Sequence, residues 1–146
     1  MQVKISASPT RNKHFRSAGE TQIARCLDRH SIAYRYEHPL AVLDRGKVRI
    51  WYPDFQLPGY GVLIEYGGVN GDVDYAAALR RKQSVYEANG LTALVWTPEH
   101  FQGDWPARLL DGIEGALVDR LYRFRAARCT ATARSLPANV TAPMPS

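Results

Sequence analysis

The chain has few cysteines and no long hydrophobic run. Its 146 residues contain only Cys26 and Cys129, which lie far apart and show no metal-ligand spacing, so neither a disulfide framework nor a zinc site is expected. No apolar segment approaches the roughly 20 residues that a transmembrane helix needs. The polar start of the sequence also lacks the apolar core of a signal peptide. We therefore expect a cytoplasmic protein with no membrane partner.

Familiar recognition motifs are also missing. The four histidines form no HxxxH or similar grouping, and no zinc finger or helix-turn-helix pattern indicates a preferred DNA sequence. With 45% hydrophobic residues, the chain is long enough to bury one core. We expect a basic N-terminal arm over residues 1–16, one domain over residues 17–128, and a disordered tail over residues 129–146, which is dominated by Thr, Ala, Pro and Ser.

The apolar patterns predict the order helix, strands, helix, strand, helix. Helices are expected from Ser17, over residues 75–88, and from Asp104 to near Arg128. Strands are expected over residues 33–43, 48–57, 62–66 and 91–96, with a turn at residues 58–61 that makes a hairpin of the middle two. A stripe of apolar residues should pack the last helix: Leu109, Leu110, Ile113, Leu117, Leu121 and Phe124. This order predicts an α/β fold in which helices flank a central mixed sheet.

Two carboxylates fall on the predicted hairpin. Asp54 follows Tyr52 and Pro53, and Glu65 lies eleven residues later in an apolar strand, where it shares a face with Leu63 and opposes Ile64. A buried carboxylate is costly unless it is paired or bound to a metal, and a neighbour of the same sign raises one of the two pKa values. Mg²⁺ or Mn²⁺ between them relieves both costs. Taken singly, Asp54 is also explained by a turn and Glu65 by an edge that faces water.

A lysine lies on the apolar face of the helix predicted over residues 75–88. At 100° per residue, Lys82 falls in one stripe with Tyr75, Leu79 and Tyr86, although two arginines show that the polar face had room for charge. Lys82 either lays its methylenes on the core and turns its ammonium to solvent, or reaches the carboxylates. In the second case it orients a water or neutralises charge on a phosphate.

These motifs occur together in one known family. The segment Tyr52-Pro53-Asp54-Phe55, the strand and turn over residues 62–68, and Tyr75 and Lys82 in the next helix resemble the PD-(D/E)xK nuclease superfamily. The likeness is strongest to branches related to very-short-patch repair endonucleases and to nuclease-like domains of superfamily 1 helicases, and it covers roughly residues 17–100. The lysine usual in the superfamily, two residues after the second acid, is replaced by Gly67, and Lys82 matches the branches that carry it on the following helix.

The resemblance implies a restriction-endonuclease-like α/β/α core and a role for each candidate residue. Asp54, Glu65 and the backbone carbonyl of Tyr66 would hold Mg²⁺, which Mn²⁺ can replace, and Lys82 would stabilise the transition state. Glu20 matches a glutamate on the first helix that commonly completes the metal site. The same residue ends a capping box, S-x-x-E, in which Glu20 bonds back to the Ser17 amide. Both roles stay open for Glu20.

The charge distribution fits a polyanionic substrate. Residues 1–50 carry ten Lys or Arg against four Asp or Glu, whereas residues 51–100 carry three against six. The side chains predicted to contact DNA are Lys13, Arg16, Arg45, Lys47 and Arg49, the last three alternating on one face of the strand that leads to Asp54. An ordinary solvated face explains those three equally well. Trp51, Tyr52 and Tyr60 suit either base stacking or core packing.

We therefore expect a Mg²⁺-dependent DNA endonuclease that hydrolyses phosphodiester bonds with a metal-activated water. One alternative is a nucleic-acid-binding module of the same fold that Gly67 leaves without activity, and another is a nuclease specific for branched DNA or RNA. A homodimer and a larger DNA-processing assembly are both compatible with the sequence. Its patterns do not separate nicking from cleavage of both strands.

Overall fold

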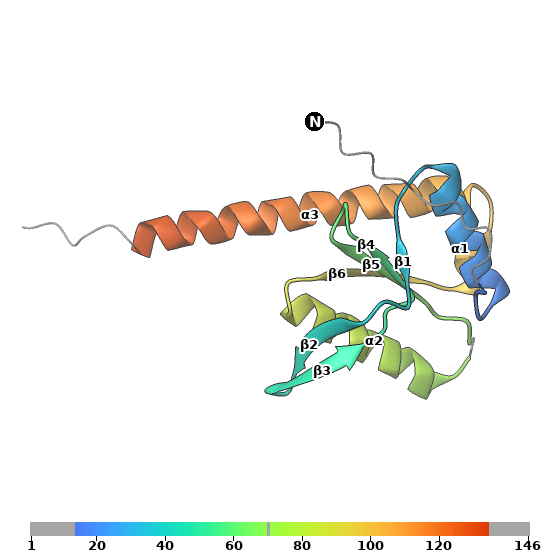
Figure 1. Ribbon diagram of the computed structural model, residues 1–146, viewed down its shortest axis with the longest axis horizontal. Helices are drawn as coiled ribbons and strands as arrows, with labels where there is room; N and C mark the ends of the chain where they lie inside the picture. The colour runs from blue at the N-terminus through green and yellow to red at the C-terminus, as the bar shows by residue number, and fades with distance from the viewer. Residues whose placement is uncertain (1–13, 70, 135–146) are drawn as a thin grey trace, which may run out of the picture.

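The structure is a computed structural model that describes residues 14–69 and 71–134 (Figure 1). Its helices are α1 (Ala18–Arg29), α2 (Val73–Ala88) and α3 (Trp105–Arg134), with a 3-10 turn, η1, at Pro98–Phe101. Its strands are β1 (Arg35–Tyr36), β2 (Leu40–Asp44), β3 (Lys47–Trp51), β4 (Phe55–Leu57), β5 (Val62–Tyr66) and β6 (Thr92–Trp96). Among the described residues, no helix combines the length and apolar character needed to cross a membrane.

A four-stranded mixed sheet forms the centre of the domain. Its order is β1-β4-β5-β6, with β5 and β6 parallel and the other pairs antiparallel, while β2 and β3 form a separate two-stranded sheet. Helices α1 and α3 cover one face of the larger sheet, and α2 with the β2–β3 hairpin covers the other (Figure 1). The predicted α/β class with a mixed sheet between helices is confirmed.

Strand β5 divides its side chains between the two cores as predicted. Val62 and Ile64 join the core under α1 and α3, whereas Leu63 packs with Tyr86 in the core under α2. Glu65 shares the face of Leu63 because side chains alternate along a strand. The alternation alone therefore aims this buried carboxylate at α2.

The predicted strand over residues 48–57 is wrong, because the structure divides it in two. Residues 47–51 form β3 and pair with β2, and the chain then bends through Pro53 before β4 begins. Proline has no backbone N–H to continue the ladder, which favours this break. The β2–β3 turn consists of Arg45 and Gly46, whose φ angles of 51° and 74° are those of a tight two-residue hairpin turn.

Helix α3 is longer and less covered than the sequence predicts. It continues through Arg134 instead of ending near Arg128, so part of the predicted tail is helical. Leu109 and Ile113 are buried, but Leu121 and Phe124 are 59% and 65% exposed, because this half of the helix projects past the sheet (Figure 1). The predicted packing of the whole stripe is therefore wrong in its second half. Residues 1–13 and 135–146 lie outside the described part of the chain.

Candidate active site

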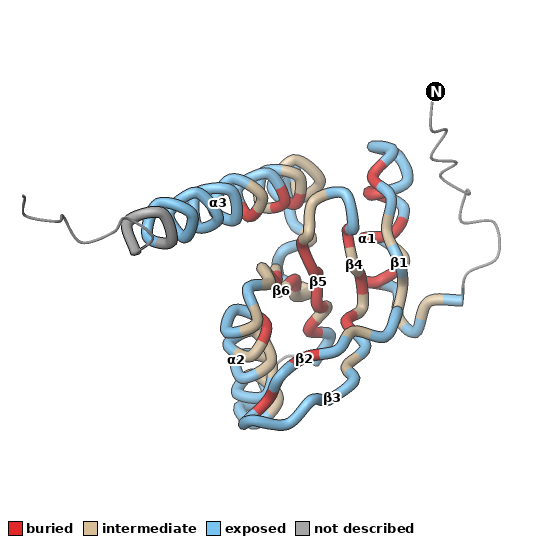
Figure 2. The backbone as a smooth tube through the Cα atoms, turned by 60° about the vertical axis from the view of Figure 1, so that its left-hand side comes forward, coloured by how far each residue is buried: buried red, intermediate tan, exposed pale blue. Residues whose placement is uncertain are grey.

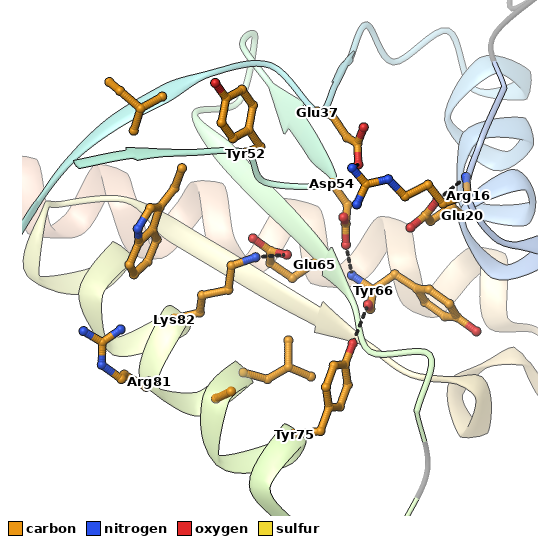
Figure 3. A pocket seen from close by; sticks show the side chains of 14 residues that line it. Arg16, Glu20, Glu37, Tyr52, Asp54, Glu65, Tyr66, Tyr75, Arg81 and Lys82 are labelled. Atoms are coloured by element: carbon orange, nitrogen blue, oxygen red, sulfur yellow. Dashed lines mark hydrogen bonds and ion pairs between the residues drawn. The ribbon is translucent and has the colours of Figure 1, made fainter. Parts of the chain in front are cut away.

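An open pocket of about 970 Å³ collects all four predicted catalytic side chains (Figure 3). Glu20 comes from α1, Asp54 from the bend before β4, Glu65 from β5 and Lys82 from α2. Tyr75 of α2 lines the same pocket. Segments from four parts of the sequence thus place these three carboxylates and the Lys82 ammonium around a single space, which Glu37 also lines.

Glu65 is the most enclosed carboxylate of the pocket. Its Oε1 accepts a hydrogen bond of 2.6 Å from the Tyr86 hydroxyl, and its Oε2 accepts one of 2.8 Å from Lys82 Nζ. Burial and this bond to Glu65 raise the pKa of Tyr86, so its hydroxyl stays a donor. Lys82 therefore reaches the carboxylates, as one of its two predicted roles requires, although its side chain is 34% exposed.

Asp54 carries the clearest electrostatic signal in the pocket. Its Oδ2 accepts a 2.7 Å hydrogen bond from the Tyr66 amide. Its pKa is raised from 3.8 to about 6, mainly by burial. The charges of Glu65 and Glu20 act in the same direction, while the amide hydrogen bond and the nearby lysine ammonium act against it. Asp54 is thus the carboxylate of the pair whose pKa rises, and burial contributes more to this rise than repulsion from Glu65 does.

This raised pKa predicts how stability depends on pH. Between about pH 4 and pH 6, the folded state binds more protons at Asp54 than the unfolded state does, so stability falls as the pH rises through that window. Asp54→Asn keeps the acceptor for Tyr66 and removes the charge. We expect it to raise the melting temperature at pH 7.5 by on the order of 5 °C, and to differ little from the unmodified chain below pH 4.

Thermal melts across pH 3.5 to 8 measure this effect. Asp111→Asn is the matched control, because it makes the same chemical change at an exposed position of α3, outside the pocket. Parallel curves for Asp54→Asn and the unmodified chain would contradict the raised pKa.

The N-cap at Ser17 is present, but the predicted bond from the Glu20 carboxylate back to the Ser17 amide is not. The Ser17 hydroxyl accepts a 3.1 Å hydrogen bond from the Glu20 amide, so the N-cap is present. The Glu20 carboxylate does not bond back to Ser17; its Oε2 instead accepts bonds from the Arg16 amide (2.9 Å) and the Tyr36 hydroxyl (2.7 Å). Burial and the Glu20 bond raise the pKa of Tyr36. The Arg16 amide and the Tyr36 hydroxyl therefore hold the Glu20 carboxylate at the pocket wall.

The pocket offers oxygen donors of the type that a small hard cation takes. Within residues 14–69 and 71–134, no group of three or more His, Cys, Asp or Glu is placed to hold a metal ion, so Glu20 is not brought in as a third carboxylate ligand. Asp54 and Glu65 remain, with the carbonyl of Tyr66, which accepts a 3.5 Å hydrogen bond from Tyr75. Mg²⁺ commonly binds through one or two carboxylates and keeps several waters. The negative charges of Glu65 and Glu20, which add to burial in raising the pKa of Asp54, would favour a cation beside these carboxylates.

Gly67 lies close to α2, and a side chain at this position would meet Leu79. A Cβ on Gly67 would lie 2.8 Å from Leu79 Cδ1 and 3.4 Å from Thr97 Cγ2. Leu79 belongs to α2, one turn before Lys82. The helix that supplies the ammonium therefore also fills the space that a side chain at position 67 would take.

A second glycine lets Tyr66 approach α1. A Cβ on Gly19 would lie 2.1 Å from Tyr66 Cζ, so Gly19→Ala forces the ring to move. We expect the free energy of unfolding to fall by about 2 kcal/mol. Replacing glycine by alanine in a helix without such a contact normally raises it by about 1 kcal/mol. Gly115→Ala is the control, because nothing lies within 4 Å of its Cβ position. Denaturant melts in which both variants gain stability would contradict this contact.

The predicted DNA-contacting residues divide into three groups. Lys13 lies outside the described residues. Arg16 and Arg49 form ion pairs with Glu37 (2.7 Å) and Asp44 (3.3 Å). Arg45 and Lys47 are exposed at the hairpin tip, but Arg45 lies in the turn, so the prediction that all three hairpin cations share one strand face is wrong.

Sequence reasoning missed several partners of the site. Arg81 binds Asp44 at 2.7 Å and lines the pocket. Tyr36 and Tyr86 hold two of the carboxylates. Tyr86 had a detectable signal, since it lies one turn after Lys82 in the same helical stripe. The pair of Asp44 and Arg81 had none, because it depends on how the β2–β3 hairpin packs against α2.

Comparison with family models, curated proteins and solved structures finds no match to this chain. The resemblance to the nuclease superfamily thus stays a prediction based on its motifs.

Proposed function

We propose that the protein is a Mg²⁺-dependent DNA endonuclease. The observation that carries this proposal is the meeting of Asp54, Glu65 and Lys82 in one open pocket. Two neighbouring carboxylates and an ammonium, with room for a polymer backbone, suit the hydrolysis of a phosphodiester. Arg45 and Lys47 are exposed at the tip of the β2–β3 hairpin, whose other end lines the pocket, and they support a polyanionic substrate.

Each residue has a defined task in the proposed reaction. Asp54, Glu65 and the Tyr66 carbonyl would hold the cation, which when bound polarises the phosphate and lowers the pKa of a water. Tyr86 fixes the orientation of Glu65 through its 2.6 Å hydrogen bond. Lys82 pairs with Glu65 in the free protein and, in the proposed complex, offers its ammonium to the charge that develops on the phosphate.

A substrate panel tests this function. Supercoiled plasmid, single-stranded DNA, branched DNA and RNA are incubated with Mg²⁺, Mn²⁺ or EDTA, beside the Asp54→Asn and Asp111→Asn variants. We expect metal-dependent cleavage that Asp111→Asn retains and Asp54→Asn loses. Cleavage in EDTA, or undiminished cleavage by Asp54→Asn, would overturn the site.

The second candidate is a binding module without activity. It is favoured by one observation, the filled space at Gly67 where the superfamily carries its lysine. Under this alternative, the protein retards DNA in a gel with or without metal and cuts none of the substrates.

A further inference from the structure

The projecting half of α3 carries an exposed apolar stripe. Val118, Leu121 and Phe124 are 42%, 59% and 65% exposed, and their three-residue spacing keeps them on one side of the helix. Figure 2 draws this half of α3 in pale blue, the colour of exposed residues. The helix packs on the sheet nearer its N-terminus, where Leu109 and Ile113 are buried. An exposed apolar surface of this kind is typical of an interaction site.

One charged residue lies in line with this stripe on each side of Leu121. At 100° per residue, positions seven residues apart differ by only about 20° around a helix, so Glu114 and Arg128 both lie nearly in line with Leu121. Both side chains are exposed. Along one line of α3, an acid is therefore followed by apolar residues centred on Leu121 and then by a base.

This order is complementary to itself when the helix is reversed. If two copies of α3 pack antiparallel about a two-fold axis at Leu121, each residue faces the one that lies equally far on the other side of Leu121. Leu121 then meets its own counterpart, and Val118 meets Phe124. Glu114 of each copy meets Arg128 of the other. Parallel packing would instead place each charge against an identical charge. The charges of the stripe thus favour an antiparallel second copy.

The charge of the whole helix has the same asymmetry. Residues 105–119 carry three acids and one arginine, whereas residues 120–134 carry five arginines and no acid. Antiparallel packing brings the acidic half of one helix beside the basic half of the other, and it also opposes the two helix dipoles. A DNA backbone or an anionic membrane surface would suit the arginines but would repel Glu114. A second copy is therefore the occupant that the stripe fits best.

We propose that the protein forms a homodimer through this stripe, with the two α3 helices antiparallel and Leu121 at the two-fold axis. From Glu114 to Arg128 the contact is about 21 Å long, at 1.5 Å per residue. One helix from each subunit over this length gives an interface at the small end of specific protein contacts. We therefore expect a dissociation constant in the micromolar range. Other elements line the pocket, so the dimer does not depend on the proposed nuclease activity.

Charge reversal tests both the contact and its orientation. Glu114→Arg and Arg128→Glu each turn two attractive contacts of the dimer into repulsive ones, so each variant should dimerise more weakly by about tenfold. The double variant Glu114→Arg/Arg128→Glu restores both pairs and should dimerise like the unmodified chain. Sedimentation velocity of the full chain, from about 1 to 300 μM, measures the dissociation constants.

Mixing the two single variants gives a second readout. One variant carries arginine at both positions and the other carries glutamate at both, so a mixed dimer has two attractive pairs where each variant alone has two repulsive ones. We expect the mixture to dimerise about as tightly as the unmodified chain. A general loss of helix stability in the variants could not produce this recovery.

Two further variants test the position of the interface. Leu121→Glu places two carboxylates at the axis and should weaken dimerisation by at least about a hundredfold. Asp119→Arg is the matched control for charge reversal, because Asp119 is exposed and lies on the side of α3 away from Leu121. It should dimerise like the unmodified chain. Thermal melts confirm that each variant is folded.

Several outcomes would overturn the inference. An unmodified chain that stays monomeric over the whole concentration range does not form this dimer, and if it binds anionic vesicles until Leu121→Glu is introduced, the stripe is a membrane face. A dimer that the single charge reversals leave unchanged uses another surface. A dimer that they weaken but the double variant does not restore is not antiparallel about Leu121. Failure of plasmid cleavage with an intact dimer counts against the nuclease alone.

Discussion

Asp54→Asn is expected to reduce Mg²⁺-dependent cleavage by roughly 10³-fold. Asn retains an oxygen for the Tyr66 amide, so the bend before β4 is preserved, but it removes one of the two negative charges that would hold the cation. The same change removes the charge whose burial, together with repulsion from Glu65 and Glu20, raises the pKa of Asp54. Loss of activity should therefore accompany a gain in thermal stability, which a misfolded variant cannot show. Single-turnover cleavage of a labelled duplex measures the rate.

Binding of the cation gives a second measurement that does not depend on cleavage. At saturating Mg²⁺, the melting temperature of the unmodified chain should rise, because a ligand that binds only the folded state stabilises it. The rise should be larger at pH 7.5 than at pH 5, where Asp54, with a pKa of about 6, is mostly protonated. Asp54→Asn should show little rise at either pH. An equal rise in the variant would place the cation elsewhere.

Local patterns predicted much of the candidate site. Alternation along β5 directs Glu65 toward α2, and the helical stripe that contains Lys82 directs its ammonium toward the same carboxylate. Both are short-range rules that act within one element. The rule for β5 and the rule for α2 point to the same place, and this explains why Glu65 and Lys82 meet as predicted.

Long-range pairing explains what the sequence could not predict. The apolar run from residue 48 continues past Pro53, and only the register between β2 and β3 shows that it belongs to two sheets. The same register brings Asp44 close to Arg49. This arginine, which the sequence predicts to contact DNA, therefore forms an ion pair within the hairpin. On α3, periodicity identifies an apolar stripe but not where the sheet beneath it ends, so Phe124 was wrongly expected to be covered.

The position of the lysine leads to the second large effect. Lys82→Met keeps the length and apolar character of the side chain but removes the ammonium, and we expect cleavage to fall by roughly 10²-fold. Arg80→Met, on the exposed face of the same helix, is the matched control and should cleave normally. If Lys82→Met retains full activity, the ammonium only pairs with Glu65 in the free protein and has no part in the reaction.

Restoring the lysine at position 67 tests the packing argument directly. Gly67 and Glu65 are two residues apart at the end of β5, so a lysine at position 67 starts from the same face, but Leu79 fills its path. In the Lys82→Met background, Gly67→Lys alone should therefore give no recovery. Adding Leu79→Ala opens the space and should return part of the lost rate. Recovery without Leu79→Ala would show that Leu79 can move aside for a lysine at position 67. Packing would then not explain the glycine.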